Sequence, residues 1–170
     1  IFLNNITTDT ENVKNIINKC EINKCRFFVL VIALQTSLIN NESHANIVIG
    51  DIKEQTVELF EPHGKRHQDS ELDGLLGGYD ISNKYIKRFL KHIIPHYKYI
   101  SPKMFLPSKG LQENVDAFNG LCITWTMLYL HYRILNPQKN RNTIINYIKK
   151  LKRNFILRYV KYVELEIKKK

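Results

Sequence analysis

The chain has 170 residues, of which 44% are hydrophobic and 25% are charged. This length suits one domain with a buried core, and the composition argues against disorder and against a membrane-embedded fold. The longest apolar run, Phe27 to Leu34, has eight residues. A transmembrane helix needs roughly 20 apolar residues, so no membrane span is expected.

The balance of charge is strongly basic. Lysine and arginine number 26 against 16 aspartates and glutamates, which gives a formal net charge of +10. Such an excess favours an acidic partner, for example DNA or an acidic protein, although a lysine-rich helix face that is simply solvated is the plainer interpretation.

The number of cysteines is odd, and no signal peptide is recognisable, so we expect free thiols in a reducing compartment, the cytoplasm or nucleus. The chain begins at Ile1, and we expect it to be part of a longer protein.

The first half of the chain predicts a helix followed by strands. Residues 8–20 have apolar side chains at helical spacing, which predicts a short amphipathic helix. Residues 26–36 form a continuous β-branched and aromatic run, typical of a central strand that is covered on both faces. The runs at 45–50 and 56–61 are short, strand-like and close together, and they predict a β-hairpin.

The second half is predicted to be mostly helical. Residues 83–97 predict a helix with one apolar face, capped by Asp80 or Ser82 and ended by Pro95. Residues 98–107 can supply one more short strand. The segment 120–137 is apolar nearly all round and predicts a buried helix, and residues 140–170 predict one or two basic amphipathic helices. Together these elements predict one α+β domain over residues 1–170.

The predicted hairpin brings an imidazole and a carboxylate together. His44 directly precedes one strand and Glu61 ends the other, and in an antiparallel pair the start of one strand lies beside the end of its partner. A carboxylate on one ring nitrogen fixes the histidine tautomer and raises the basicity of the other nitrogen. His44 and Glu61 are therefore candidates for a general base and the residue that orients it.

Cys122 is the candidate nucleophile. It lies at the predicted start of the buried helix, where the unpaired N–H groups and the helix dipole favour a thiolate. Gln112, in the preceding loop, is placed to donate to an oxyanion, together with a backbone N–H of the helix start. The alternative interpretation is that Cys122 is a small apolar core residue, as most cysteines in apolar helices are.

The order His44, Glu61, Gln112, Cys122 resembles that of the clan CE cysteine proteases, which include the ubiquitin-like-protein proteases and the adenovirus protease. His44 and Glu61 are 17 positions apart, similar to that family, and the motifs "SHANIVIGD", "ELFEPHG" and "GLCITW" are similar to protease-like domains of large DNA viruses. The resemblance covers about residues 26–137 and leaves 140–170 as a basic helical extension. It implies a papain-like fold in which a small mixed sheet with a His/Glu hairpin packs against the cysteine-bearing helix.

The resemblance has two departures. In better-known members the nucleophile directly precedes a glycine, and that register places Asn119 at the nucleophile position. The protein would then be an inactive binding module that recognises a protein or nucleic acid. Ala45 also stands where many relatives have a tryptophan, which bears on the shape of the substrate groove.

The resemblance implies a thiol peptidase or isopeptidase that cleaves after Gly-Gly segments of ubiquitin-like modifiers or of a viral polyprotein, in an infected cell or in a virion. No cofactor is implied. A zinc site at Cys20 and Cys25 lacks a second ligand pair at suitable spacing, and His63 in "EPHG" is interpreted as a solvated loop residue.

Overall fold

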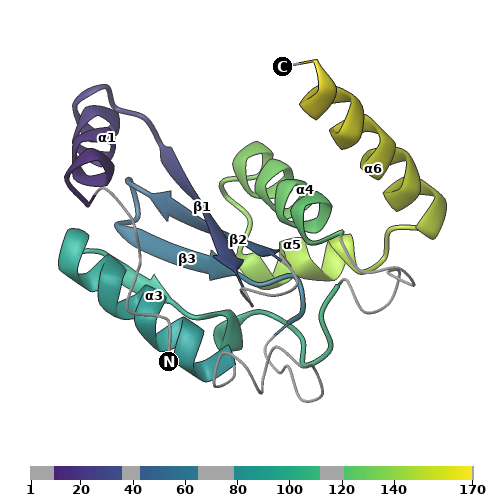
Figure 1. Ribbon diagram of the computed structural model, residues 1–170, viewed down its shortest axis with the longest axis horizontal. Helices are drawn as coiled ribbons and strands as arrows, with labels where there is room; N and C mark the ends of the chain where they lie inside the picture. Colours follow the sequence, from purple (N-terminus) through teal and green to yellow (C-terminus); the bar gives the residue numbers. More distant parts are fainter. Residues whose placement is uncertain (1–9, 36–42, 65–78, 112–120, 170) are drawn as a thin grey trace.

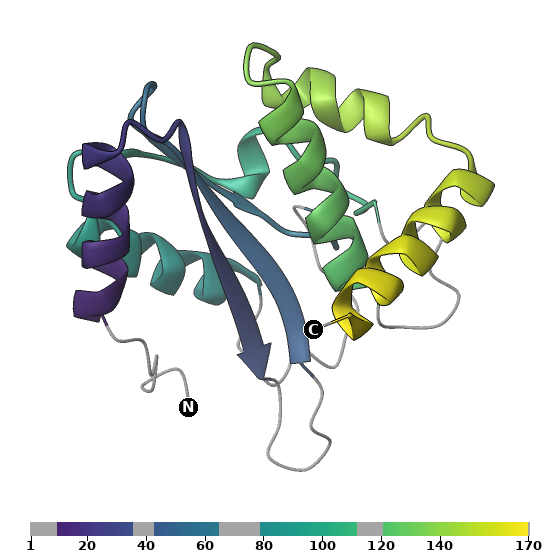
Figure 2. The same ribbon diagram turned by 90° about the horizontal axis from the view of Figure 1, so that it is seen from above.

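A central sheet separates two layers of helices in the computed structural model, which describes residues 10–35, 43–64, 79–111 and 121–169. Figure 2 shows α1 and α3 on one side of the strands and α4, α5 and α6 on the other. The α+β class expected from the sequence is confirmed, with a mixed sheet of four strands. Among the described helices, none combines the length and apolar character needed to cross a bilayer.

The sheet follows the chain order (Figure 1). It contains β1 (Phe27–Gln35), β2 (Ser43–Asp51), β3 (Thr56–Phe60) and β4 (Lys98–Ile100), arranged β1-β2-β3-β4. β1, β2 and β3 pair antiparallel, and β4 runs parallel to β3. The predicted hairpin is therefore confirmed as β2 and β3.

The prediction that residues 26–36 form a central strand is wrong. β1 pairs only with β2 and lies at the edge of the sheet, and Val31 is 69% exposed. Its apolar character has another cause, since Phe28 packs into the core on one face and Phe27 and Val29 pack against the core on the other. An unbroken apolar run indicates that both faces of a strand pack against other parts of the protein. It does not indicate whether the strand has a neighbour on one edge or on both.

The helices α1 (Thr10–Ile22) and α3 (Tyr79–Ile93) cover one face of the sheet. The apolar positions of α3 recur at helical spacing, and three of them are buried against the β2–β3 hairpin: Ile86, Leu90 and Ile93. Helical periodicity thus predicted α3 correctly. The start was predicted too late, because α3 begins at Tyr79. Asp80 and Ser82 therefore lie inside the helix, and the prediction that one of them caps it is wrong.

The helices α4 (Cys122–Leu135), α5 (Arg141–Ile148) and α6 (Arg153–Lys168) cover the other face. The side chain of Asn140 accepts a hydrogen bond from the Thr143 N–H and caps α5. A short 3₁₀ helix, η1 (Pro102–Met104), follows β4. The buried core on this face joins residues of all three helices with the sheet, namely Ile47, Ile49, Phe60, Trp125, Leu128, Tyr129, Ile144, Ile145, Ile148 and Ile156.

A buried ionic cluster holds the second half of α4 on the sheet. Glu58, in the middle of β3, is 1% exposed, and Arg133 of α4 is 3% exposed. The Arg133 Nε lies 3.1 Å from the Glu58 Oε1 and donates to it, and Tyr129 donates its hydroxyl to the same oxygen at 2.7 Å. Burial, and then the charge of Glu58, raise the pKa of Tyr129 well above its usual value, so this hydroxyl remains a donor.

The cluster extends to the loop after α4 and to the start of β1. Asp51, at the end of β2, pairs with Arg26 at 3.2 Å and with Arg133 at 3.6 Å. Both arginines also donate to the backbone carbonyl of Pro137, and Arg141 of α5 pairs with Glu58. Because each buried charge is paired and hydrogen-bonded, the cluster fixes the position of α4 relative to β2 and β3.

Candidate functional site

The start of α4 lies against the start of β2. Cys122 is the first residue of α4 and is 7% exposed. The Thr126 hydroxyl, one turn further on, lies 2.6 Å from the Cys122 carbonyl oxygen and 3.3 Å from the Ala45 carbonyl oxygen. Ala45 directly follows His44 on β2. The structure therefore brings the residue that follows the predicted base next to the helix that begins with the predicted nucleophile.

Glu61 lies at the same end of the sheet. It follows Phe60, which pairs with Ile47, so continuing the register places residue 61 beside Asn46, two residues after His44. Glu61 is 5% exposed, and its carboxylate accepts a hydrogen bond from the His63 backbone N–H at 3.0 Å. The carboxylate is thus buried and held by the turn that ends the hairpin.

The loop that leads to Gln112 is packed onto this turn. Gly110 meets the backbone of residues 62–64 so closely that a Cβ there would lie 2.3 Å from the Pro62 carbonyl oxygen and 2.2 Å from the His63 carbonyl carbon. Gly64 has φ +91°, a conformation suited to glycine. Leu111 is 3% exposed and belongs to the α4 core. The chain is therefore fixed beside the Glu61 turn immediately before Gln112.

We predict that Gly110→Ala destabilises the fold by about 1–3 kcal/mol, because the added Cβ would push two backbone segments apart and no side chain can rotate to make room. Urea unfolding followed by circular dichroism measures the loss. Ser108→Ala, in the same loop and exposed, is the matched control, expected to change stability by less than about 0.5 kcal/mol. Equal stability of the Gly110 variant and the control would contradict the close approach.

Part of the predicted site lies outside the described residues. The structure places His44 as a residue of β2, but its side chain is not among those described. Gln112 and Asn119 fall in the segment 112–120, which also lies outside. The two registers that make Cys122 or Asn119 the nucleophile are therefore not distinguished by the geometry.

Sequence reasoning missed two polar residues at this end of the sheet. Asn46 is 2% exposed, and its Oδ1 is buried without a hydrogen-bond partner in the described structure. Thr126, 3% exposed, anchors the start of α4. Each is a polar residue in an otherwise apolar segment, and this pattern is the sequence signal that could have identified both. That signal also applies to Glu58 and Arg133.

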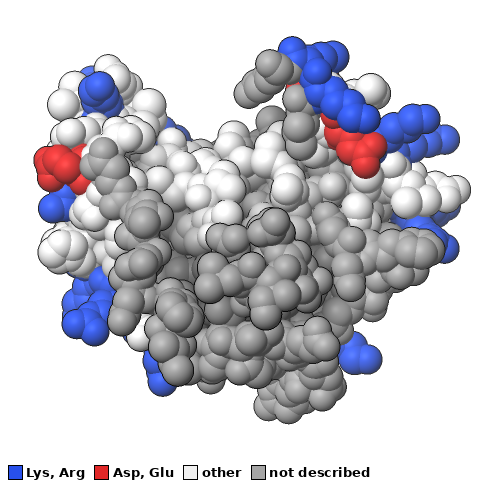
Figure 3. Space-filling model, in the orientation of Figure 1, with Lys and Arg blue, Asp and Glu red and all other residues white. Residues whose placement is uncertain are grey.

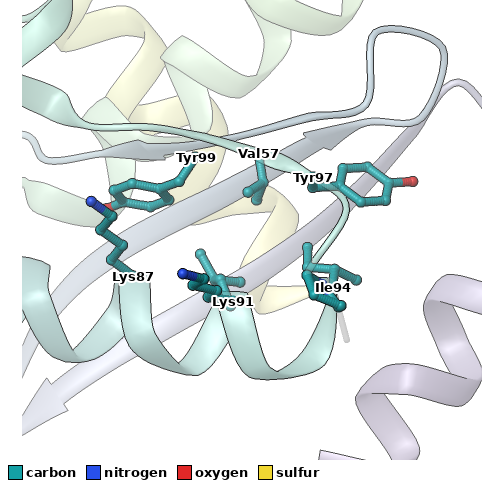
Figure 4. Close-up of a pocket in the computed structure, with 8 residues that line it drawn as sticks. Val57, Lys87, Lys91, Ile94, Tyr97 and Tyr99 are labelled. Carbon is teal, nitrogen blue, oxygen red and sulfur yellow. The ribbon is translucent and has the colours of Figure 1, made fainter.

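A pocket of about 230 Å³ lies on the opposite face of the sheet (Figure 4). Val57 of β3, Leu90 of α3 and Tyr99 of β4 form part of its wall. Val57 and Leu90 belong to the core on the side of the sheet away from α4. The pocket therefore does not serve Cys122. Within the described ranges, no three histidine, cysteine or acidic side chains lie together in a way that could hold a metal ion.

Comparison with known proteins gives one distant similarity. The chain is 27% identical over 147 residues to a protein of Acanthamoeba polyphaga mimivirus that bears the name ankyrin repeat protein. The match covers 75% of this chain and 18% of the length of that protein. No protein family model matches the chain, and no solved structure matches it.

These comparisons correct the assignment made from the sequence. The resemblance of His44, Glu61, Gln112 and Cys122 to the clan CE cysteine proteases is not supported, because the similarity found is to a viral protein named for ankyrin repeats and to no protease family. The physical reason for the error is that residue order and spacing along a hairpin and a helix recur in unrelated proteins. A function for this end of the sheet has to be argued from its geometry alone.

Proposed function

We propose that the chain is a thiol hydrolase that cleaves a peptide or isopeptide bond with Cys122 as its nucleophile. The observation that carries the proposal is the Thr126 hydroxyl, which lies between the carbonyl oxygens of Cys122 and Ala45. It ties the helix start that bears the thiol to the strand start that bears His44. A thiol is activated by a helix N-terminus and by a neighbouring histidine, and we propose that His44 supplies the second of these features.

Each group has a definite role in the proposed reaction. His44 takes the proton from the Cys122 thiol, and the thiolate attacks the carbonyl carbon. The C–N bond breaks, His44 returns the proton to the leaving amine, and water then hydrolyses the thioester. Glu61 orients His44, while Gln112 and the backbone N–H groups at the start of α4 stabilise the oxyanion. A segment that ends in Gly-Gly was implied only by the family resemblance, and we keep it as the first substrate to be tested.

Labelling with an electrophilic probe tests the proposal. The protein is incubated with thiol-reactive ubiquitin-tail and SUMO-tail probes, and the modified cysteine is located by peptide mass spectrometry. We expect the adduct on Cys122, although Cys25 is far more accessible to solvent. Adducts only on Cys20 or Cys25 would indicate unspecific alkylation, and no reaction with a panel of tails and peptides would favour the inactive module built on the Asn119 register.

A second candidate function is binding of an acidic protein through α5 and α6. The observation that favours it is a run of exposed basic side chains, which we name the α5–α6 basic surface: Lys149, Lys150, Lys152, Arg153, Arg158 and Lys161. Figure 3 shows basic side chains gathered over the end of the molecule where α6 lies in Figure 1. Phe155 and Leu157 of α6 are 42% and 48% exposed, and apolar anchors beside cations suit a protein partner.

We predict that Lys150→Glu combined with Lys152→Glu and Arg153→Glu weakens binding to an acidic polypeptide at least about tenfold at low salt, since like charges repel across such an interface. Fluorescence anisotropy with polyglutamate and with a single-stranded oligonucleotide of equal charge measures the affinities. The matched control reverses the charges of Lys14, Lys19 and Lys24, in and after α1, of which Lys19 and Lys24 are exposed and Lys14 is half-buried. Tighter binding to the oligonucleotide would identify nucleic acid as the partner, and equal losses in both variants would indicate a net-charge effect alone.

A further inference from the structure

The end of α1 is built as a Schellman motif with a cysteine at each of its two contact positions. The Cys25 N–H donates to the Cys20 carbonyl oxygen at 2.9 Å, and the Lys24 N–H donates to the Glu21 carbonyl oxygen at 3.1 Å. Lys24 between them has φ +56°. These are the two nested hydrogen bonds and the left-handed residue that define the motif.

The motif brings the side chains of Cys20 and Cys25 together. In a Schellman motif the residue in the last helical turn and the second residue beyond the helix cap usually touch through their side chains. Here both positions are cysteines, and the backbone hydrogen bond from Cys25 to Cys20 joins them directly. Both are present as free thiols. A Schellman motif holds the backbones of these two positions close together, so two thiols placed there can join with little movement of the chain.

We propose that Cys20 and Cys25 form a redox modification site, in which a peroxide oxidant closes a reversible disulfide across the end of α1. The proposal does not depend on the function proposed for Cys122.

The two thiols have different exposures and therefore different roles. Cys25 is exposed, whereas Cys20 is half-buried against the α1–α3 core. Burial, and then the hydrogen bond and charge of Cys25, raise the pKa of the Cys20 thiol. Cys25 is thus the thiol that a dissolved oxidant meets first, and Cys20 is the neighbour that resolves the oxidised state.

The reaction balances with hydrogen peroxide as the only co-reactant. The Cys25 thiolate attacks one peroxide oxygen, which breaks the O–O bond and gives a sulfenic acid and one water after protonation. The Cys20 sulfur then attacks the Cys25 sulfur, loses its proton, and displaces the second oxygen as water. Two thiols are oxidised to one disulfide, and one peroxide is reduced to two waters. A dithiol reductant reverses the change.

The closed disulfide would act next to the buried ionic cluster. Arg26 directly follows Cys25 and pairs with Asp51 at 3.2 Å while donating to the Pro137 carbonyl oxygen. Tying Cys25 to α1 therefore restrains the segment from which Arg26 reaches the end of β2 and the loop after α4. The expected physical effect is slower opening of the last turn of α1.

The test uses the full chain carrying Cys122→Ala, so that only this cysteine pair remains. After peroxide treatment, we expect the peptide that contains both cysteines to lose two hydrogen atoms in mass and to regain them on reduction. Amide hydrogen exchange at the last turn of α1 should slow in the oxidised form and return to its original rate on reduction. Cys20→Ser should instead accumulate a sulfenic acid on Cys25 that a dimedone probe captures.

Two results would overturn the proposal. One is oxidation of Cys25 to sulfinic acid in the chain that retains Cys20, because a resolving thiol in contact should react first. The other is formation of dimers linked through Cys25 in place of the internal bond. Cys25→Ser is the matched variant and should show no mass loss and no dimedone adduct at either position, which assigns the first step to Cys25.

Discussion

Cys122→Ala is expected to abolish probe labelling and to lower the hydrolysis of a fluorogenic Gly-Gly substrate by about a thousandfold or more, because no other group can form the thioester. Cys122 begins α4 and is 7% exposed, so a methyl group in place of the thiol leaves the helix and its packing intact. Unchanged thermal unfolding of the variant would show that the loss is chemical. The measurement is the steady-state rate at saturating substrate.

Two further variants separate the roles at this site. His44→Ala should reduce the rate by about 10²–10⁴-fold, the usual contribution of a general base, and should leave slow labelling of Cys122 by the most reactive probes. Asn119→Ala should change the rate little if Cys122 is the nucleophile. Full activity of the Cys122→Ala variant, or loss of activity in the Asn119→Ala variant alone, would refute the proposed role of Cys122.

Arg133→Ala is expected to destabilise the protein by about 3–5 kcal/mol, since it leaves the buried Glu58 and Asp51 carboxylates without their shared partner. Arg133 is 3% exposed and contacts both carboxylates. Urea unfolding measures the change in free energy. Arg158→Ala, at an exposed position of α6, is the matched control and should change stability by less than about 0.5 kcal/mol.

A double variant distinguishes loss of pairing from loss of packing. Arg133→Met combined with Glu58→Gln removes the charge from both sides while it keeps most of the volume. We expect it to recover at least half of the stability that Arg133→Met alone loses. The buried carboxylate that remains is Asp51, which Arg26 balances, while Arg141, the other partner of Glu58, is partly exposed to water. If the double variant instead loses as much stability as the two single variants added together, the pair contributes through packing only.

Much of the fold could be predicted from the sequence because local patterns determine local structure. The 3.6-residue spacing of apolar side chains in α3, the helix ended before Pro137, and the two strand-like runs that became β2 and β3 were all recognised from a few neighbouring residues. The position of β1 in the sheet could not be predicted this way, since strand order depends on contacts between segments far apart in the chain.

The candidate site was recognised only in part. Antiparallel pairing is a local property, so the placement of Glu61 at the end of the hairpin where β2 begins follows from its place in the sequence. The contact of Gly110 with residues 62–64 joins segments nearly fifty positions apart, and no local pattern predicts it. The assignment to a protease family was wrong because it rested on residue order, which carries no information about ancestry at such short motifs.

By itself, the sequence determined the α+β class, the β2–β3 hairpin and the start of α4 at Cys122, because each depends on periodicity or on turn-forming and helix-ending residues within about 20 positions. The tertiary structure alone decided that β1 lies at an edge, that Glu58 and Arg133 meet in the core, and that Thr126 ties the start of α4 to Ala45. These contacts gain their stability from the burial of groups that lie far apart in the chain. Only the packed molecule determines which groups are buried together.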